Sequence, residues 1–277
     1  MILTMDIGNS TIKAGVFDGE NLAAYWRIST SKLGTSDELG ILLSSFFANK
    51  SLSLSDISGV IYSSVVPTVN YTVEHMCRSY INQEALQVST NLDLGVKILY
   101  DHPSQLGSDR VANAVGAYFI YGGPVIYVDF GTASTFGVVD KDGVFLGGAI
   151  CPGLKLSAEA LVTGAAKLPR VELVKPESAI GRSTVSNIQA GLILGTVGQI
   201  EYIIRRMRTE LGEPEAKVIA TGGMAKLISS ESKYIDVLDG LLTLKGLRIL
   251  YERNGSVPAG RSPAPNMTSG RFDILGT

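Results

Sequence analysis

The fold is decided by the stretch Leu3-Thr4-Met5-Asp6-Ile7-Gly8-Asn9-Ser10-Thr11-Ile12-Lys13-Ala14-Gly15-Val16. Apolar and polar residues alternate on both sides of a small polar centre, which predicts a strand, a tight turn and a returning strand. Gly8 lets the backbone turn, and the next three residues place short polar groups beside exposed amides, which suits a phosphate. Asp6 adds an anion there, so we expect it to seat a hydrated Mg²⁺ ion. An ordinary hairpin without a ligand is the alternative.

The same pattern occurs a second time, in Val125-Ile126-Tyr127-Val128-Asp129-Phe130-Gly131-Thr132-Ala133-Ser134-Thr135-Phe136-Gly137-Val138-Val139. Asp129 follows Asp6 at an offset of 123 residues, and each copy is followed by a second Asp-Gly pair, at Asp18 and Asp142. Two hairpins at half-chain spacing indicate a duplicated domain. Two such turns that face each other across a cleft could hold one nucleotide triphosphate from both sides.

The composition favours a well-folded protein and gives no support for binding to nucleic acid or to a membrane. The chain has 277 residues, a hydrophobic fraction of 45%, 18% charged residues and a mean hydropathy of +0.23, which argue for well-filled cores. A net charge of −2 gives no electrostatic support for nucleic acid or an anionic membrane. The N-terminus reaches Asp6 too soon for a signal peptide, so we expect a cytoplasmic protein. Cys77 and Cys151 lack metal spacing and are predicted to be free thiols.

Periodicity and turn residues divide the chain into two domains and a tail. We expect domains at residues 1–121 and 122–253, with Gly122-Gly123-Pro124 as the hinge, and a flexible tail at 254–277, either native or left by cloning. Further strands are expected at 22–29, 59–65, 144–150 and 218–221. Helices are expected at about 35–50, 67–81, 108–118, 152–168, 184–211 and 243–253. The order of these elements predicts an α/β fold.

The second group of candidate residues lies at the start of the third predicted helix, in Gly107-Ser108-Asp109-Arg110. A helix N-terminus attracts anions. Arg110 adds a planar cation suited to a carboxylate, beside an aspartate that could accept a proton. The alternative is that Ser108 and Asp109 only cap the helix. Tyr100 precedes this group in a segment that the following Pro103 keeps extended.

Two features of the second half remain open at the level of sequence. Thr184 could cap the helix that runs to Leu211, or it could contact a substrate. That helix carries an apolar stripe that could be core or a dimer seam; its members are Ile188, Leu192, Ile200, Ile203, Ile204 and Met207. The segment 218–223 ends in two glycines, which would let a flat adenine approach the backbone or would simply end a strand.

Taken together, the motifs resemble those of the type III pantothenate kinases, a family of the actin, Hsp70 and sugar-kinase superfamily. The resemblance rests on the first hairpin, on Gly107 to Arg110, on the second hairpin and on residues 218–223, and it covers residues 1 to about 253. Phe130 and Ser134 depart from the family pattern without removing a chemical group. The resemblance implies a duplicated actin-like (ribonuclease H-like) ATPase fold with a nucleotide cleft between two domains.

The resemblance also assigns residues. It implies ATP binding by Asp6, Ile7, Gly8, Asn9, Ser10, Thr11, Ile12 and Lys13 and by Thr132. It implies pantothenate contacts by Tyr100, Gly107, Ser108, Asp109, Arg110 and Thr184, with Asp109 as the base that deprotonates the substrate hydroxyl. Asp129 matches a site for a monovalent cation, K⁺ or NH₄⁺, and Mg²⁺ would accompany ATP near Asp6. The family is homodimeric, with its substrate pocket near the dimer seam.

The sequence therefore predicts ATP-dependent phosphorylation of pantothenate to 4'-phosphopantothenate, the first step of coenzyme A biosynthesis. Arg110 would hold the carboxylate of the substrate. Two alternatives stay open: a superfamily kinase for a sugar or another small hydroxylated acid, and a regulator that binds nucleotide without chemistry. Retention of Asp109 beside Arg110 argues against the regulator.

Overall fold

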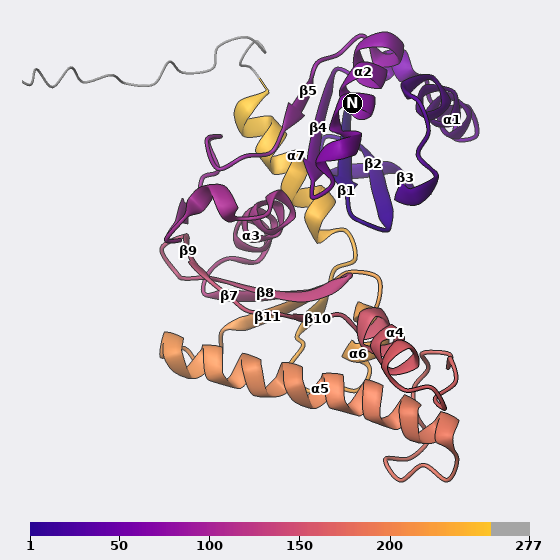
Figure 1. Ribbon diagram of the computed structural model, residues 1–277. Helices are drawn as coiled ribbons and strands as arrows, with labels where there is room; N and C mark the ends of the chain where they lie inside the picture. The colour runs from indigo at the N-terminus through magenta and orange to yellow at the C-terminus, as the bar shows by residue number, and fades with distance from the viewer. Residues whose placement is uncertain (256–277) are drawn as a thin grey trace, which may run out of the picture.

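The computed structural model describes residues 1–255, and it contains two sheets flanked by helices (Figure 1). The predicted tail lies outside the described residues from position 256 onward. The first sheet has the order β3-β2-β1-β4-β5. Its strands are β1 (Ile2–Ile7), β2 (Thr11–Asp18), β3 (Asn21–Ser29), β4 (Gly59–Ser64) and β5 (Ala85–Gln87).

The second sheet repeats the arrangement of the first. Its order is β12-β11-β7-β8-β9-β6, with β10 paired to β8. Its strands are β6 (Lys97–Ile98), β7 (Val125–Phe130), β8 (Ala133–Val139), β9 (Val144–Gly147), β10 (Ile150–Pro152), β11 (Lys217–Thr221) and β12 (Val237–Leu238). In each half the first strand pairs antiparallel with its hairpin partner, β2 or β8, and parallel with a later strand, β4 or β11. The predicted duplication of the hairpin is confirmed.

The helices begin and end close to the predicted positions, with some differences. They are α1 (Ser36–Ala48), α2 (Asn70–Met76), which continues as a π-helical turn at Cys77–Ile81, α3 (Ser108–Tyr121), α4 (Leu154–Gly164), α5 (Thr184–Leu211), α6 (Ala225–Ser229) and α7 (Leu242–Asn254). The Thr35 side chain caps α1 together with Glu38, which agrees with the helix predicted to begin at about residue 35. The possible capping role of Thr184 is wrong, because the cap of α5 is Ser183, whose hydroxyl accepts a bond from the Ser186 amide.

Helix α5 runs along one side of the second sheet, and α3 lies on the other side (Figure 1). The apolar stripe of α5 is core rather than dimer seam, because it packs on the sheet. Ile193, Ile200 and Ile204 are fully buried in one cluster with residues of β7, β8 and β11. The outward face of α5 carries Gly191, Gly195 and Gly198, where an added Cβ would meet no atom within 4 Å.

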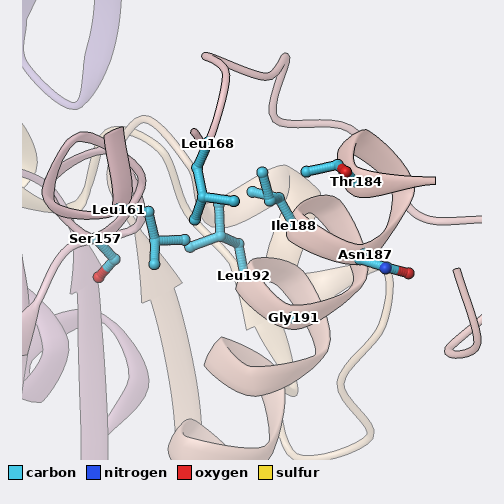
Figure 2. A pocket seen from close by; sticks show the side chains of 8 residues that line it. All are labelled: Ser157, Leu161, Leu168, Thr184, Asn187, Ile188, Gly191 and Leu192. Atoms are coloured by element: carbon cyan, nitrogen blue, oxygen red, sulfur yellow. The ribbon is translucent and has the colours of Figure 1, made fainter. Parts of the chain in front are cut away.

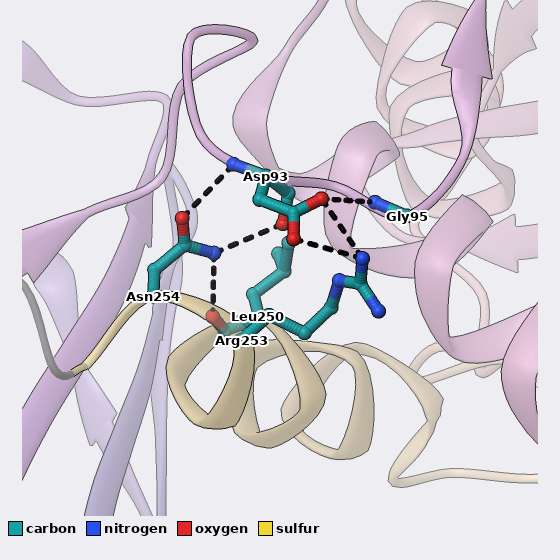
Figure 3. A network of polar contacts seen from close by, with 5 residues as sticks. All are labelled: Asp93, Gly95, Leu250, Arg253 and Asn254. Carbon is teal, nitrogen blue, oxygen red and sulfur yellow. Dashed lines mark hydrogen bonds and ion pairs between the residues drawn. The ribbon is translucent and has the colours of Figure 1, made fainter.

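Helix α7, the last helix within residues 1–255, packs against the first half of the chain. α7 contacts β1, β4 and α3, and its buried leucines share a core cluster with residues of both sheets. The end of α7 is fixed to the loop before β6: Arg253 makes two bonds to Asp93, and the Asn254 side chain bonds the backbone of Asp93 and of Leu250 (Figure 3). Asn254, the first residue of the predicted tail, is therefore a buried helical residue. The division at residues 121 and 122 stays a prediction.

No helix among residues 1–255 has the length and apolarity needed to cross a membrane.

Candidate active site

The first hairpin places Asp6 next to the end of β1, between two polar neighbours on adjacent strands. Its register partners are Lys13 on β2 and Ser63 on β4. Lys13 Nζ lies 3.2 Å from Asp6 Oδ2, and Ser63 Oγ donates to Asp6 Oδ1 at 2.9 Å. The carboxylate is thereby held in one orientation at the base of the turn.

The turn that follows Asp6 is held by hydrogen bonds at its base, and its tip is exposed to solvent. The Gly8 amide donates to the Thr11 carbonyl at 3.1 Å, and the Thr30 hydroxyl donates to the Gly8 carbonyl at 2.7 Å. Asn9 and Ser10 are exposed at the tip. The loop therefore has the form expected of a phosphate-binding turn, with its polar tip free for a ligand.

The second hairpin presents Asp129 in the position equivalent to Asp6, but its surroundings differ. Its register partners are threonines, Thr135 on β8 and Thr221 on β11. Its Oδ2 accepts a hydrogen bond from Asn113 Nδ2 of α3 at 3.1 Å. Thr132 is exposed at the tip of this turn, and its carbonyl accepts a bond from the Gly153 amide. Both turns therefore offer a polar tip at the end of a carboxylate-bearing strand.

The N-terminus of α3 is attached directly to the first sheet. Ser108 Oγ donates to the Ser64 carbonyl at 3.1 Å and accepts from the Ser64 amide at 2.9 Å. The residue at the cap position is Gly107, which has no side chain to cap with, so the alternative role of Ser108 and Asp109 as caps is wrong. Ser64 directly follows Ser63, the neighbour of Asp6, and this attachment brings Asp109 to the end of β1.

The electrostatics show that the three carboxylates lie near one another. Burial, together with the charges of Asp6 and Asp129, raises the pKa of Asp109 to about 6, against the lowering influence of a hydrogen bond from the Arg110 backbone and of the Arg110 charge. Burial also raises the pKa of Asp129, which Lys13 opposes. A carboxyl group with a pKa near neutrality can take up a proton during turnover and release it afterwards.

The side chain of Arg110, which follows Asp109 in the sequence, packs against two aromatic rings. Its guanidinium carbon is 5.8 Å from the ring centre of Tyr100 and 5.7 Å from that of Phe145. One terminal nitrogen reaches the Phe136 carbonyl at 3.5 Å, while the buried Nε has no partner among the described residues. A buried cation with an unused donor favours an anionic ligand, and a carboxylate is the planar group that matches it.

The residues around Asp129 fit a monovalent cation. No hydrogen bond among residues 1–255 ends on its Oδ1 atom, and the neighbouring Thr221 hydroxyl is buried without a partner there. An oxygen-coordinated cation would satisfy both groups. Asp6, by contrast, is already paired with Lys13, so a divalent ion there would be held through water. Within the described part of the chain no three His, Cys, Asp or Glu side chains form a direct metal cluster.

Comparison with known proteins agrees with this arrangement. The family model for type III pantothenate kinases matches residues 2–206. A type III pantothenate kinase of Brevibacillus brevis is 49% identical over 256 residues, which cover 92% of this chain and 100% of the relative. The chain belongs to the type III pantothenate kinase family.

Solved structures place the fold among the actin-like ATPases and sugar kinases. A putative Baf family transcriptional activator from Campylobacter jejuni aligns with a TM-score of 0.59 at 18% identity, covering 92% of this chain and 100% of that one. A putative 2-dehydro-3-deoxygalactonokinase from Sinorhizobium meliloti aligns at 0.57 and 13% identity, over 95% and 99% of the two chains. At these identities the likeness shows the fold alone. The predicted duplicated actin-like fold is confirmed.

One residue assigned by the family resemblance lies apart from the others. Thr184 starts α5 and lines a groove of about 510 Å³ between α5 and α4, with Leu161, Leu168, Ile188 and Leu192 on its walls (Figure 2). Among residues 1–255 no hydrogen bond joins Thr184 to Tyr100, Asp109 or Arg110. Its assignment as a substrate contact stays a prediction.

The structure adds site residues that the sequence pattern did not single out. Ser63 holds Asp6, Asn113 holds Asp129, and Phe145 stacks beside Arg110. The sequence carries no local signal for Ser63, because its contact with Asp6 arises only from the pairing of β4 beside β1. The glycine turn after β11 also differs from expectation: Gly222 packs against Asp129 and Phe130, so the room for a ligand is at Gly223, where an added Cβ would meet no atom within 4 Å.

Proposed function

We propose that this protein transfers the γ-phosphoryl group of ATP to the terminal hydroxyl of pantothenate, giving 4'-phosphopantothenate in the first step of coenzyme A biosynthesis. Membership of the type III pantothenate kinase family supports the reaction. The observation that carries it is the position of Asp109, which feels the charges of the carboxylates of both turns and directly precedes Arg110, whose guanidinium is buried.

In this proposal Asp109 is the catalytic base. The substrate hydroxyl oxygen attacks the γ-phosphorus, the bond from that phosphorus to the bridging oxygen of ADP breaks, and the hydroxyl proton passes to Asp109. The unused Nε donor of Arg110 supports its role in holding the substrate carboxylate. Tyr100, Gly107 and Ser108 would form the walls of the same subsite.

The two hairpin turns would hold the phosphates. Residues 6–13 and Thr132 supply backbone amides and short polar side chains, and Lys13 supplies a positive charge. Mg²⁺, bound through water near Asp6, would neutralise phosphate charge when ATP is present. We further propose K⁺ or NH₄⁺ at Asp129, supported by its Oδ1 atom and the Thr221 hydroxyl, neither of which has a hydrogen-bond partner within residues 1–255.

We also propose a homodimer formed through the outward face of α5. The stripe of Gly191, Gly195 and Gly198 would allow a second helix to approach closely, and Tyr202 is exposed beside it. Such a dimer would cover the groove at Thr184 and would offer a reason why that residue lies apart from Arg110 within one chain. A monomeric mass by light scattering at working concentration would refute it.

The reaction is tested by measuring ATP consumption with pantothenate, simple sugars and small hydroxy acids, each with and without K⁺. We expect turnover with pantothenate alone among these acceptors, and 4'-phosphopantothenate as the product by mass spectrometry. Turnover with another acceptor would favour the alternative of a different superfamily kinase. ATP binding without turnover on any acceptor would favour a regulator. We expect a cytoplasmic protein that binds neither nucleic acid nor membrane.

A further inference from the structure

The buried side-chain amide of Asn113 links the Asp129 carboxylate to the Thr243 hydroxyl. It is fully buried on α3. Its Nδ2 donates to Asp129 Oδ2 at 3.1 Å, and its Oδ1 accepts from the Thr243 hydroxyl of α7 at 2.8 Å. The two bonds agree on one amide orientation, because an ionised carboxylate needs a donor and a hydroxyl proton needs an acceptor. Thr243 thus fixes which side of the amide faces Asp129.

The contact between Asn113 and Thr243 depends on an unusually close helix crossing. A Cβ on Gly116 of α3 would lie 2.8 Å from the Leu242 carbonyl and 3.3 Å from the Gly246 Cα, so the two backbones touch. Asn113 and Thr243 each precede one of these glycines by three residues, which puts both on the crossing face one turn away. A wider crossing would separate the hydroxyl from the amide.

Asp129 needs this support more than Asp6 does. Asp6 receives an ammonium group and a hydroxyl from its two neighbouring strands. The equivalent neighbours of Asp129 are Thr135 and Thr221. Among residues 1–255, the Asp129 carboxylate accepts a single hydrogen bond, which comes from Asn113. The orientation of Asp129 is therefore set from the helix layer rather than from the sheet.

We propose that Asn113, fixed by Thr243, is a positioning residue that orients the Asp129 carboxylate for a monovalent cation. This inference rests on the cation role proposed for Asp129. The amide occupies Oδ2 and leaves Oδ1 beside Gly222. Thr221 is the register partner of Asp129, and its buried hydroxyl has no partner among residues 1–255. Thr243 of α7, which lies 130 residues from Asn113 in the sequence, would then influence the cation site through its hydroxyl.

The test compares Thr243→Val, which removes the hydroxyl at similar shape, with Thr243→Ser, which keeps it. Tyr121→Phe is the matched control, because it removes one hydrogen bond from α3, to Asp239, outside the site. The melting temperature of each protein is measured against KCl concentration, with choline chloride holding the ionic strength constant. The K⁺ concentration for half-maximal activity is measured in parallel.

We expect wild type, Thr243→Ser and Tyr121→Phe to share one K⁺ midpoint, and Thr243→Val to need about 10-fold more K⁺ in both measurements, as is typical when the support of a metal ligand is removed. Thr243→Ala replaces Thr243→Val if the latter does not fold. An unchanged midpoint in Thr243→Val, with only a lower melting temperature, would overturn the positioning role alone. A wild type that responds to K⁺ no more than to choline would overturn the cation role of Asp129 and this inference with it, while leaving the kinase reaction intact.

Discussion

Lys13 Nζ lies 3.2 Å from Asp6 Oδ2, and the two residues face each other across the first hairpin. Burial lowers the pKa of Lys13, but the charges of Asp6 and Asp129 outweigh it and raise the pKa. Lys13 therefore stays protonated and offsets carboxylates from both hairpins. The second hairpin has Thr135 at the equivalent position. The duplicated turns share a shape, but the charge balance of the site is not symmetric.

Lys13→Met should destabilise the protein, because it leaves Asp6 without its cation. The pair is only partly exposed, at 18% and 11% of the two side chains. Complete loss of a buried partner costs about 3–5 kcal/mol, so we expect about 1–3 kcal/mol at this partly solvated site, measured by urea denaturation. The double variant Lys13→Met/Asp6→Asn should recover part of that stability but no activity. A single variant as stable as wild type would show that the pair contributes nothing to folding.

Asp109→Asn separates the roles of base and structural residue. Asparagine keeps the size of the side chain but cannot accept the substrate proton, so we expect kcat to fall by roughly 10²–10⁴. ATP binding and the fold should persist, because Gly107 rather than Asp109 occupies the cap position of α3. Single-turnover kinetics and calorimetric titration with ATP measure the two effects. A near-wild-type rate of the chemical step would remove Asp109 from the mechanism.

The pH dependence follows from the raised pKa of Asp109. The base must be ionised, so kcat/KM for pantothenate should rise with pH and level off above about 6. The same shift affects folding: a carboxyl group whose pKa is higher in the folded state favours folding most when it is protonated. As the pH rises from about 4 to about 6, the free energy of unfolding of wild type should therefore fall relative to that of Asp109→Asn. A stability difference that does not change over that range would contradict the buried environment of Asp109.

Arg110→Lys should weaken substrate binding more than catalysis. Lysine keeps the charge but loses the planar, two-pronged donor set and the stacking between Tyr100 and Phe145. We expect KM for pantothenate to rise by roughly 10-fold to 100-fold, the equivalent of a charged hydrogen bond, with little change in KM for ATP. Phe145→Leu is a useful companion, since it removes one stacking partner and keeps the guanidinium. An equal rise in both KM values would place Arg110 outside the pantothenate subsite.

The local parts of this fold could be predicted from the sequence, because their causes are local. Alternation and an Asp-x-Gly turn are sufficient to define each hairpin, and the Thr35 to Glu38 capping box marks the start of α1. The apolar stripe of α5 could be recognised from the sequence. The surface that covers it could not, because either the second sheet or a second subunit would bury an apolar helix face. The sheet covers it here.

The contacts that complete the site were beyond sequence analysis because they join distant segments. Ser63 reaches Asp6 across 57 positions, and Thr243 reaches Asn113 across 130. A serine on a buried strand and an asparagine within a helix have no local pattern that distinguishes them from ordinary residues. Only the packing of β4 beside β1, and of α7 across α3, gives them their partners.

Gly222→Ala should disrupt the site, whereas Gly223→Ala should not disturb the fold. Gly222 has a φ of +95°, and an added Cβ would collide with Asp129 Oδ1 and the Phe130 backbone. The strained backbone alone costs about 1–2 kcal/mol, and the displaced carboxylate adds to it. We expect a lower melting temperature and a loss of K⁺ activation for Gly222→Ala. At Gly223 a Cβ meets open space, so its alanine variant should melt like wild type. If adenine lies against this turn, Gly223→Ala should instead raise KM for ATP. Equal melting temperatures for the two variants would mean that Gly222 does not set the position of Asp129.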